Sequence, residues 1–190
     1  MDKIFISGTG RCGTTFLMKL FTLLDYKTGY DKKTYLTHVF KNCNSGLEID
    51  PTRNSKELEI FKSPKLIADI DDILKKNKDW LKLKLMIIPV RNYEKAAQSR
   101  VKHGHRRGGL WNAKDKQTQI RYYKNIIADY VHYMLKHNIN TIFLDFDEMV
   151  SNKEYLYVNL KPLFMERNIT FEKFSDAYDK ASATSKPKKE

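Results

Sequence analysis

A glycine-rich turn close to the N-terminus constrains this chain more than any other feature. The apolar residues 4–6 lead into the turn 7–13, Ser-Gly-Thr-Gly-Arg-Cys-Gly, and an amphipathic pattern begins at Thr14. This order predicts a strand, a turn and a helix. Glycines let the backbone approach an anion closely, and the free amides and partial positive charge at a helix start favour negative oxygen there. The turn is therefore predicted to bind a phosphate-like anion, with a forked cation from Arg11 and hydroxyl donors from Thr14 and Thr15.

The spacing of the turn separates three kinds of anion site. Gly8 and Gly13 have the spacing of a Walker A loop, but that motif has Lys after the second glycine, where this chain has Thr14. Gly8, Gly10 and Gly13 also fit the dinucleotide fingerprint G-x-G-x-x-G, which needs a second strand ending in an acid about 20 residues later. Residues 25–31 supply no apolar strand at that point. The sequence therefore gives little support to a Walker A loop or to a dinucleotide-binding site.

The third pattern is Gly-x-x-Arg-x-Gly-Thr-Thr, and the chain fills it with Gly8, Arg11, Gly13, Thr14 and Thr15. It resembles the 5′-phosphosulfate loop of the sulfotransferases that use 3′-phosphoadenosine-5′-phosphosulfate (PAPS), in the version with Arg rather than Lys. The resemblance implies that the whole loop holds the 5′-phosphosulfate, through Gly8, Thr9, Gly10, Arg11, Cys12, Gly13, Thr14 and Thr15. The Cys12 thiol fills a small-residue position, and its place beside Arg11 and a helix start predicts a depressed pKa.

A second motif supports the same family. Residues 83–90 form a strand candidate that delivers Arg91 to its C-terminal end, and Asn92 can cap the helix that follows. Ser99 lies eight residues after Arg91. In the sulfotransferases that this chain resembles, an Arg and a Ser in this arrangement grip the 3′-phosphate. The usual Pro after Arg-Asn is Tyr93 here, a departure that affects helix geometry rather than chemistry.

Two anion sites on two strand-to-helix turns suit a nucleotide with anionic groups at both ends of its ribose. A third, approximate match to the family is the segment 141–150, in which residues 146–149 stand where the family has a Tyr-Glu-Asp-Leu-like sequence. In a kinase, Asp145 or Asp147 would instead hold magnesium at a strand end. The resemblance runs in order from about residue 3 to residue 165.

A hydroxyl acceptor must lose its proton during transfer, so the family resemblance also implies a general base. Asp31 stands 20 residues after Arg11, close to the distance at which the Arg-type relatives carry an acidic base, although theirs is Glu. His38 and Glu59 are the alternatives. An Asp beside a glycine can equally serve its own turn.

The resemblance implies catalytic roles for two further residues: Arg11 is expected to stabilise the charge that develops on the bridging oxygen, and Lys62 to act at the reacting group. The latter lies in Lys62-Ser63-Pro64, which looks like the Lys-x-Pro found after the second strand in several branches of the family. It is expected to contact the transferred group or the acceptor, while an ordinary exposed Lys remains the alternative.

The predicted fold is α/β, a three-layer sandwich with a mostly parallel central sheet, and the resemblance implies the P-loop NTPase-like version of it. Strands are expected near residues 3–7, 58–61, 83–90 and 141–146. Helices are expected near 14–24, 65–76, 92–103 and 114–137 and again up to about 178, with an irregular stretch at 25–56. The chain of 190 residues is expected to form one domain over residues 1–179 and a basic, disordered tail over 180–190.

Charge and cysteine content limit which binding partners and which cellular compartment we expect. Lys and Arg number 35 against 23 Asp and Glu, a net charge of +12 that favours anionic partners. The sharpest basic patch is residues 103–107. With only Cys12 and Cys43, no long apolar run and no histidine spacing typical of a metal site, we expect a cytoplasmic protein without a membrane span, a leader or a bound metal.

The resemblance thus implies a small PAPS-dependent sulfotransferase that moves a sulfuryl group to a hydroxyl or amine and releases 3′-phosphoadenosine-5′-phosphate (PAP). The acceptor could be a carbohydrate, a peptide or a small molecule, and the excess charge favours an acidic one. Two alternatives stay open: a phosphotransferase with a degenerate P-loop, and a noncatalytic basic protein that binds nucleotide or nucleic acid. The tyrosines fall mostly at helical spacing rather than on a base-stacking platform, which argues against nucleic acid.

Overall fold

A parallel sheet of four strands forms the centre of the molecule. The computed structural model describes residues 2–40, 43–51, 55–103 and 108–185. The sheet order is β4-β1-β5-β6, with β1 at Lys3–Ile6, β4 at Ile60–Lys62, β5 at Leu83–Val90 and β6 at Thr141–Asp145. Every neighbouring pair is parallel, and residue pairs such as Ile4 with Ile60 set the register. Because parallel strands share one polarity, the segments that follow them emerge together at the carboxyl edge of the sheet.

Helices fill the connections between these strands. They are α1 (Thr14–Leu23), α2 (Lys65–Ala68), α3 (Ile70–Lys76), α4 (Tyr93–His103), α5 (Lys116–His137), α6 (Phe146–Ser151), α7 (Lys153–Met165) and α8 (Phe171–Ala183). A short 3₁₀ turn, η1 (Tyr35–His38), precedes a two-stranded antiparallel pair formed by β2 (Val39–Phe40) and β3 (Ser45–Gly46).

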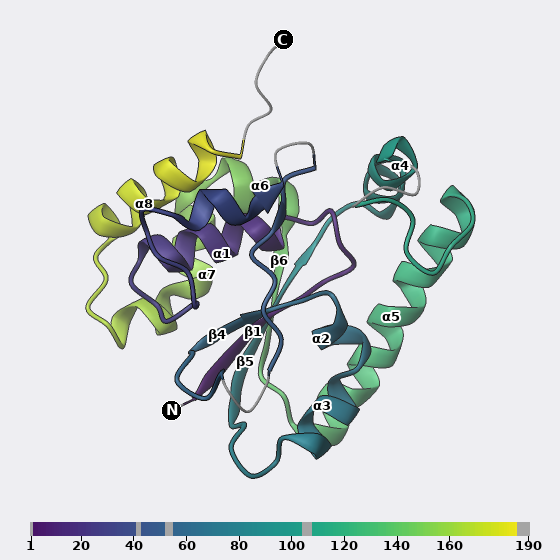
Figure 1. Ribbon diagram of the computed structural model, residues 1–190, viewed down its shortest axis with the longest axis horizontal. Helices are drawn as coiled ribbons and strands as arrows, with labels where there is room; N and C mark the ends of the chain where they lie inside the picture. Colours follow the sequence, from purple (N-terminus) through teal and green to yellow (C-terminus); the bar gives the residue numbers. More distant parts are fainter. Residues whose placement is uncertain (1, 41–42, 52–54, 104–107, 186–190) are drawn as a thin grey trace.

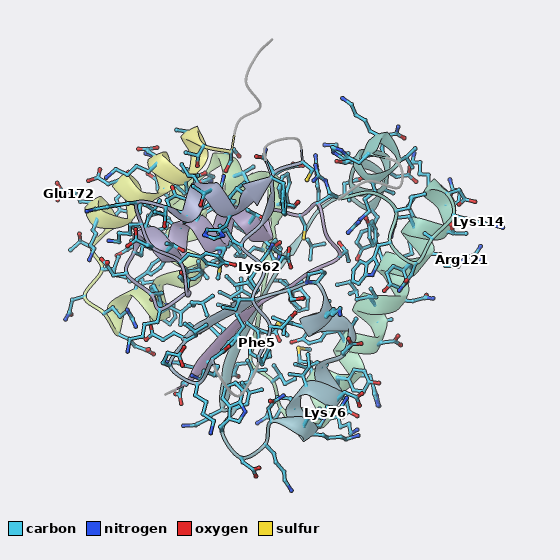
Figure 2. All side chains as sticks on the ribbon, in the orientation of Figure 1. Phe5, Lys62, Lys76, Lys114, Arg121 and Glu172 are labelled. Carbon is cyan, nitrogen blue, oxygen red and sulfur yellow. The ribbon has the colours of Figure 1, made fainter. Side chains whose placement is uncertain are left out.

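Two apolar cores lie on opposite faces of the sheet, because successive strand side chains point to opposite sides. Figure 1 shows α1, α7 and α8 on one side of the strands and α2, α3 and α5 on the other. The first core contains Ile6 and Ile87 packed against α1, α7 and α8. The second contains Phe5, Met86 and Ile88 packed against α2, α3 and α5. Phe5 lies at the middle of the sheet in Figure 2 and is fully buried, so truncating it to alanine is expected to cost roughly 3–5 kcal/mol of folding free energy.

This arrangement confirms the predicted α/β class with a parallel sheet covered on both faces. The helix predicted over residues 65–76 is divided at Asp69, which ends α2 and begins α3 with a φ of −114°. The pair β2–β3 was not expected in the irregular stretch. The last helix, α8, continues to Ala183, beyond the expected start of a tail at residue 180. Residues 186–190 lie outside the described residues.

Over the described residues, none of the helices has both the length and the apolar run needed to cross a membrane.

Candidate anion-binding site

The predicted glycine turn lies at the carboxyl edge of the sheet, between β1 and α1. Gly13 is the N-cap of α1 and has a φ of 86°, a conformation that favours glycine. No side chain caps the first turn of α1, and that turn contains no acidic residue. The amides that a helix start leaves unpaired are therefore not used by a side-chain cap. This is the arrangement that binds oxyanions at helix N-termini.

Arg11 joins the two predicted motifs. Its φ is 59°, and its side chain turns from the loop toward α4, where Nε donates a hydrogen bond of 3.0 Å to Ser99 Oγ. A second hydrogen bond runs from the guanidinium to the backbone carbonyl of Cys43. Burial lowers the pKa of the Arg11 guanidinium, and the nearby cations Arg100 and Arg91 lower it further. The structure thus brings the predicted 5′ loop and the predicted 3′-phosphate residues into direct contact.

Arg91 lies where the sequence predicts it, directly after β5. Its guanidinium donates a 3.1 Å hydrogen bond to the backbone carbonyl of Arg11 and lies 4.5 Å above the centre of the Phe146 ring. Asn92 accepts a 3.1 Å hydrogen bond from the amide of Lys95, which confirms the predicted cap of α4. The plane of the Arg91 fork is therefore fixed by a strand end, a loop carbonyl and an aromatic ring.

The two threonines at the start of α1 differ in their surroundings. The Thr14 hydroxyl makes no hydrogen bond within the described residues, so it is free to donate. Thr15 is buried, and its hydroxyl accepts a 3.2 Å hydrogen bond from Lys62 Nζ and donates a long one of 3.4 Å to the Gly46 carbonyl. Thr14 fits the predicted role of a ligand donor better than Thr15 does.

Lys62 is not an ordinary exposed lysine. Only 2% of the residue is exposed, and Figure 2 places it in the interior of the molecule. Its ammonium group donates 2.7 Å to the Gly46 carbonyl and forms a 2.5 Å ion pair with Glu48 Oε1. Lys62 thus connects the end of β4 with the start of α1 and with β3.

Glu48 contacts the candidate site and was not predicted from the sequence. Backbone hydrogen bonds between Ile49 and Lys62, of 2.8 and 3.0 Å, hold its segment beside the end of β4. The Glu48 side chain is 45% exposed while its carboxylate contacts buried Lys62. Nothing in the sequence around Glu48 signals this, because the contact depends on a bridge between segments far apart in the chain.

Five buried side-chain polar atoms lack a hydrogen-bond partner within the described part of the chain, and four of them surround the glycine turn. The four are Thr9 Oγ1, Arg91 Nε, Arg100 Nε and the Tyr123 hydroxyl, while the fifth belongs to Ser182 on α8. Buried polar groups are nearly always paired, so such a cluster calls for an explanation. Arg11, Arg91 and Arg100 also form no ion pair with a carboxylate of the described residues. The surroundings of the turn are therefore cationic and rich in unused donors.

Sequence reasoning also missed Arg100 and Tyr123. Arg100 continues the buried face of α4 that Ala96 and Ala97 begin, at helical spacing from both. An arginine on the otherwise apolar face of this helix was the sequence signal that could have identified Arg100. Tyr123 lies on the buried face of α5 and gave no comparable signal.

The structure corrects the prediction for Cys12. The thiol is fully buried, and burial raises its pKa despite the nearby cations Lys62 and Arg100. A buried, neutral thiol packs like a small apolar side chain, as its small-residue position suggested.

The predicted general bases lie in different surroundings. Asp31 is exposed, and its carboxylate accepts a 2.7 Å hydrogen bond from the Lys33 amide within its own turn. His38 is exposed and lies against Tyr30, with 5.2 Å between the ring centres. Glu59 precedes β4 at the amino edge of the sheet, where it accepts from the Lys27 amide and pairs with Arg167. Its position across the sheet from the turn rules Glu59 out as the base.

Asp145 and Asp147, at and just after the end of β6, are the carboxylates that would hold magnesium in a kinase. Both already have partners within the protein. Asp145 caps α6 by accepting a 2.9 Å hydrogen bond from the Glu148 amide. Asp147 forms a 3.6 Å ion pair with Lys95. Of the basic patch at 103–107, only His103 lies within the described residues, and burial and then Arg11 lower its pKa.

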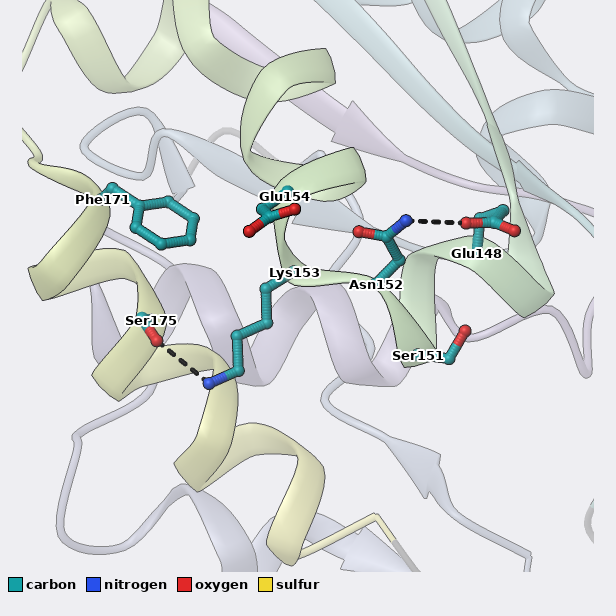
Figure 3. A pocket seen from close by; sticks show the side chains of 7 residues that line it. All are labelled: Glu148, Ser151, Asn152, Lys153, Glu154, Phe171 and Ser175. Atoms are coloured by element: carbon teal, nitrogen blue, oxygen red, sulfur yellow. Dashed lines mark hydrogen bonds between the residues drawn. The ribbon is translucent and has the colours of Figure 1, made fainter.

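A separate hollow of about 590 Å³ lies between the α6–α7 junction and α8. Figure 3 shows Lys153 reaching across it to Ser175, with Glu154 and Phe171 nearby. It contains no residue of the glycine turn, and Lys153 is already paired with Asp179 at 2.6 Å. We therefore place the candidate site at the turn.

Comparison of the chain with protein-family models, with curated proteins and with solved structures finds no significant match.

Proposed function

We propose that the protein is a PAPS-dependent sulfotransferase with a P-loop NTPase-like fold. The observation that carries the proposal is the meeting of two anion-binding motifs at adjacent strand ends. The glycine turn follows β1, Arg91 follows the neighbouring strand β5, and Arg11 hydrogen-bonds Ser99 between them. A donor with a 5′-phosphosulfate and a 3′-phosphate needs two such sites separated by one ribose.

The residues present suit that donor chemically. The α1 amides and the Thr14 hydroxyl are positioned for the 5′ group, and Arg91 and Ser99 for the 3′-phosphate. The unpaired buried donors around the turn support an anionic ligand, because an oxyanion accepts hydrogen bonds from all of them. Arg11 lies between the two groups, so its present partners would be exchanged for ligand oxygens on binding.

The bound donor supplies a sulfuryl group whose sulfur forms a bond to the acceptor oxygen or nitrogen while its bond to the bridging phosphate oxygen breaks. Arg11 and the loop amides stabilise the charge that develops on that leaving oxygen. Lys62 fixes Thr15 and Glu48 around the start of α1, and its ammonium group offsets negative charge there.

The acceptor proton needs a carboxylate nearby, and we assign it to Glu48 rather than to Asp31. Glu48 contacts Lys62, which contacts the first turn of α1, and its side chain is exposed enough to meet an acceptor. The contacts of Asp31 are confined to its own turn. An acidic acceptor and a cytoplasmic location complete the proposal; the net charge of +12 supports the first, and the two free cysteines are compatible with the second.

A panel of nucleotides in a thermal-shift assay tests the proposal. PAP at about 100 times its dissociation constant should stabilise the protein by roughly 2.7 kcal/mol. AMP at the same concentration should stabilise it far less, because AMP leaves the Arg91–Ser99 site empty. Equal stabilisation by AMP, or a preference for ATP with magnesium or for NAD, would contradict the proposal.

A further inference from the structure

Arg100 is a buried cation that lies directly against the glycine turn. The residue is 8% exposed, and a Cβ added to Gly10 would lie 2.0 Å from one of its terminal nitrogens. The guanidinium also donates a hydrogen bond to the Gly109 carbonyl and lies 5.6 Å from the centre of the Trp111 ring. Gly10, with a φ of 78°, therefore lets a buried cation lie directly against the turn.

Two further donors lie in the same place. Thr9 is 2% exposed and Tyr123 is fully buried; the Thr9 hydroxyl has no partner among the residues described, and the Tyr123 hydroxyl has only the Arg100 guanidinium beside it, which can donate but not accept. The Tyr123 hydroxyl is close enough to Arg100 for the guanidinium to oppose the pKa rise that burial causes. Together with Arg100 Nε, these are three groups around the turn that can each donate a hydrogen bond and have no acceptor among the residues described.

Three donors without an acceptor destabilise the folded protein. Leaving a buried polar group unpaired costs about 1–3 kcal/mol, and more for a charged group. No carboxylate of the described residues pairs with Arg100 to offset its charge. A ligand that carries only hydrogen-bond acceptors would pair with these donors and remove the cost. Phosphate and sulfate oxygens are such acceptors.

We propose that Arg100 and Tyr123, together with Thr9, form an inner wall of the anion site and bind a phosphate or sulfate oxygen of the ligand. The inference rests on the proposed function only for the identity of the nucleotide. The binding role of these three residues holds for any oxyanion ligand. The wall adds a third arginine, from the second half of α4, to the site of Arg11 and Arg91.

Two measurements on hydroxyl variants test this wall: the change in folding stability and the change in affinity for the ligand. Thr9→Val and Tyr123→Phe each remove a hydroxyl whose proton has no acceptor, and each keeps the shape of the side chain. In the free protein Thr9→Val should leave the urea midpoint unchanged or raise it, because no native hydrogen bond is lost, and Tyr123→Phe should lower it by no more than the loss of one contact with Arg100. The same variants should weaken binding of pyrophosphate and of PAP roughly 3- to 10-fold by calorimetry, the range of one neutral hydrogen bond.

Charge variants give a further measurement. Arg100→Gln should weaken both ligands roughly 10- to 150-fold, as expected for a lost charge-assisted contact, and Arg100→Lys should lose less. Arg121→Gln is the matched control, because Arg121 is exposed on the outer side of α5 and should leave both affinities unchanged. If Arg100→Gln does not fold, the Thr9 and Tyr123 variants decide.

Thr9→Val and Tyr123→Phe proteins that bind pyrophosphate like the parent would overturn the wall and make these groups structural. A parent that binds pyrophosphate but prefers neither PAP nor AMP would contradict the sulfotransferase proposal, while the variants would still decide the wall. A parent that binds neither anion would overturn both.

Discussion

Replacing Arg91 by alanine should weaken binding of PAP while leaving binding of AMP nearly unchanged. Arg91 spends one hydrogen bond on the Arg11 carbonyl at 3.1 Å and stacks on Phe146 at 4.5 Å, while its buried Nε has no partner in the described part of the chain. The remaining donors of the fork can therefore grip a phosphate. Losing a charge-assisted contact costs about 1.5–3 kcal/mol, which is roughly a 10- to 150-fold rise in Kd.

The substitution should leave the protein folded. The lost contact with the Phe146 ring costs roughly 0.5–2 kcal/mol, against a typical folding free energy of about 5–15 kcal/mol. Titration calorimetry with PAP and with AMP, in one buffer at one salt concentration, measures the two affinities, and urea unfolding checks the fold. The exposed Arg121→Ala variant controls for net charge. Equal losses for PAP and AMP, or no loss for either, would refute a 3′-phosphate site at Arg91.

Three further predictions follow from the same structure. Once an acceptor is known, Glu48→Gln should lower turnover by roughly 10²- to 10⁴-fold with PAP affinity retained, whereas Asp31→Asn should turn over normally; the reverse pattern would return the base to Asp31. Because burial raises the pKa of Cys12, iodoacetamide should alkylate it far more slowly in the folded protein than in urea at pH 8, as mass spectrometry of the Cys12 peptide can measure, and equal rates would contradict its burial. Hydrogen bonds with Lys75, Lys136 and His137 hold the pKa of the Asp71 carboxyl well below the usual range, so their stabilising effect is present above about pH 4 and is lost as the pH falls through the folded value. Asp71→Asn should therefore flatten the fall in thermal midpoint on acidification below pH 4, and an unchanged profile would show that Asp71 does not contribute.

Local patterns in the sequence were enough to predict most of the fold. The strand at residues 83–90 has the predicted bounds, and α1, α4 and α5 begin and end within about two residues of their predicted limits, since each carries a strong apolar period or a cap. The order of strands and helices was enough to predict a parallel sheet. The break at Asp69 was not predictable from periodicity, because the apolar residues on both sides of it face the same core.

The part of the site that the sequence could predict is the part encoded by spacing. There are two such motifs: the turn with Gly8, Arg11 and Gly13, and the pair formed by Arg91 and Ser99. They lie together because β1 and β5 are neighbours in the sheet. The missed residues depend on tertiary contacts. Glu48 reaches the site through an isolated bridge to β4, and Arg100 and Tyr123 through the packing of α4 on α5.

The Cys12 prediction failed for a similar physical reason. A helix start and a neighbouring Arg favour the thiolate, but burial favours the thiol, and burial is visible only in the folded structure. The Glu59 alternative fails because this residue precedes β4, at the edge of the sheet opposite to the glycine turn.

A crystal structure of the protein with PAP tests the central claim most directly. We predict the 5′-phosphate within hydrogen-bond distance, about 3 Å, of the amides at the start of α1, and the 3′-phosphate at the same distance from Arg91 and Ser99. Arg11 should exchange at least one of its present partners for a ligand oxygen. A nucleotide bound elsewhere, such as in the hollow between the α6–α7 junction and α8, or bound with only one phosphate at the carboxyl edge of the sheet, would contradict the proposal.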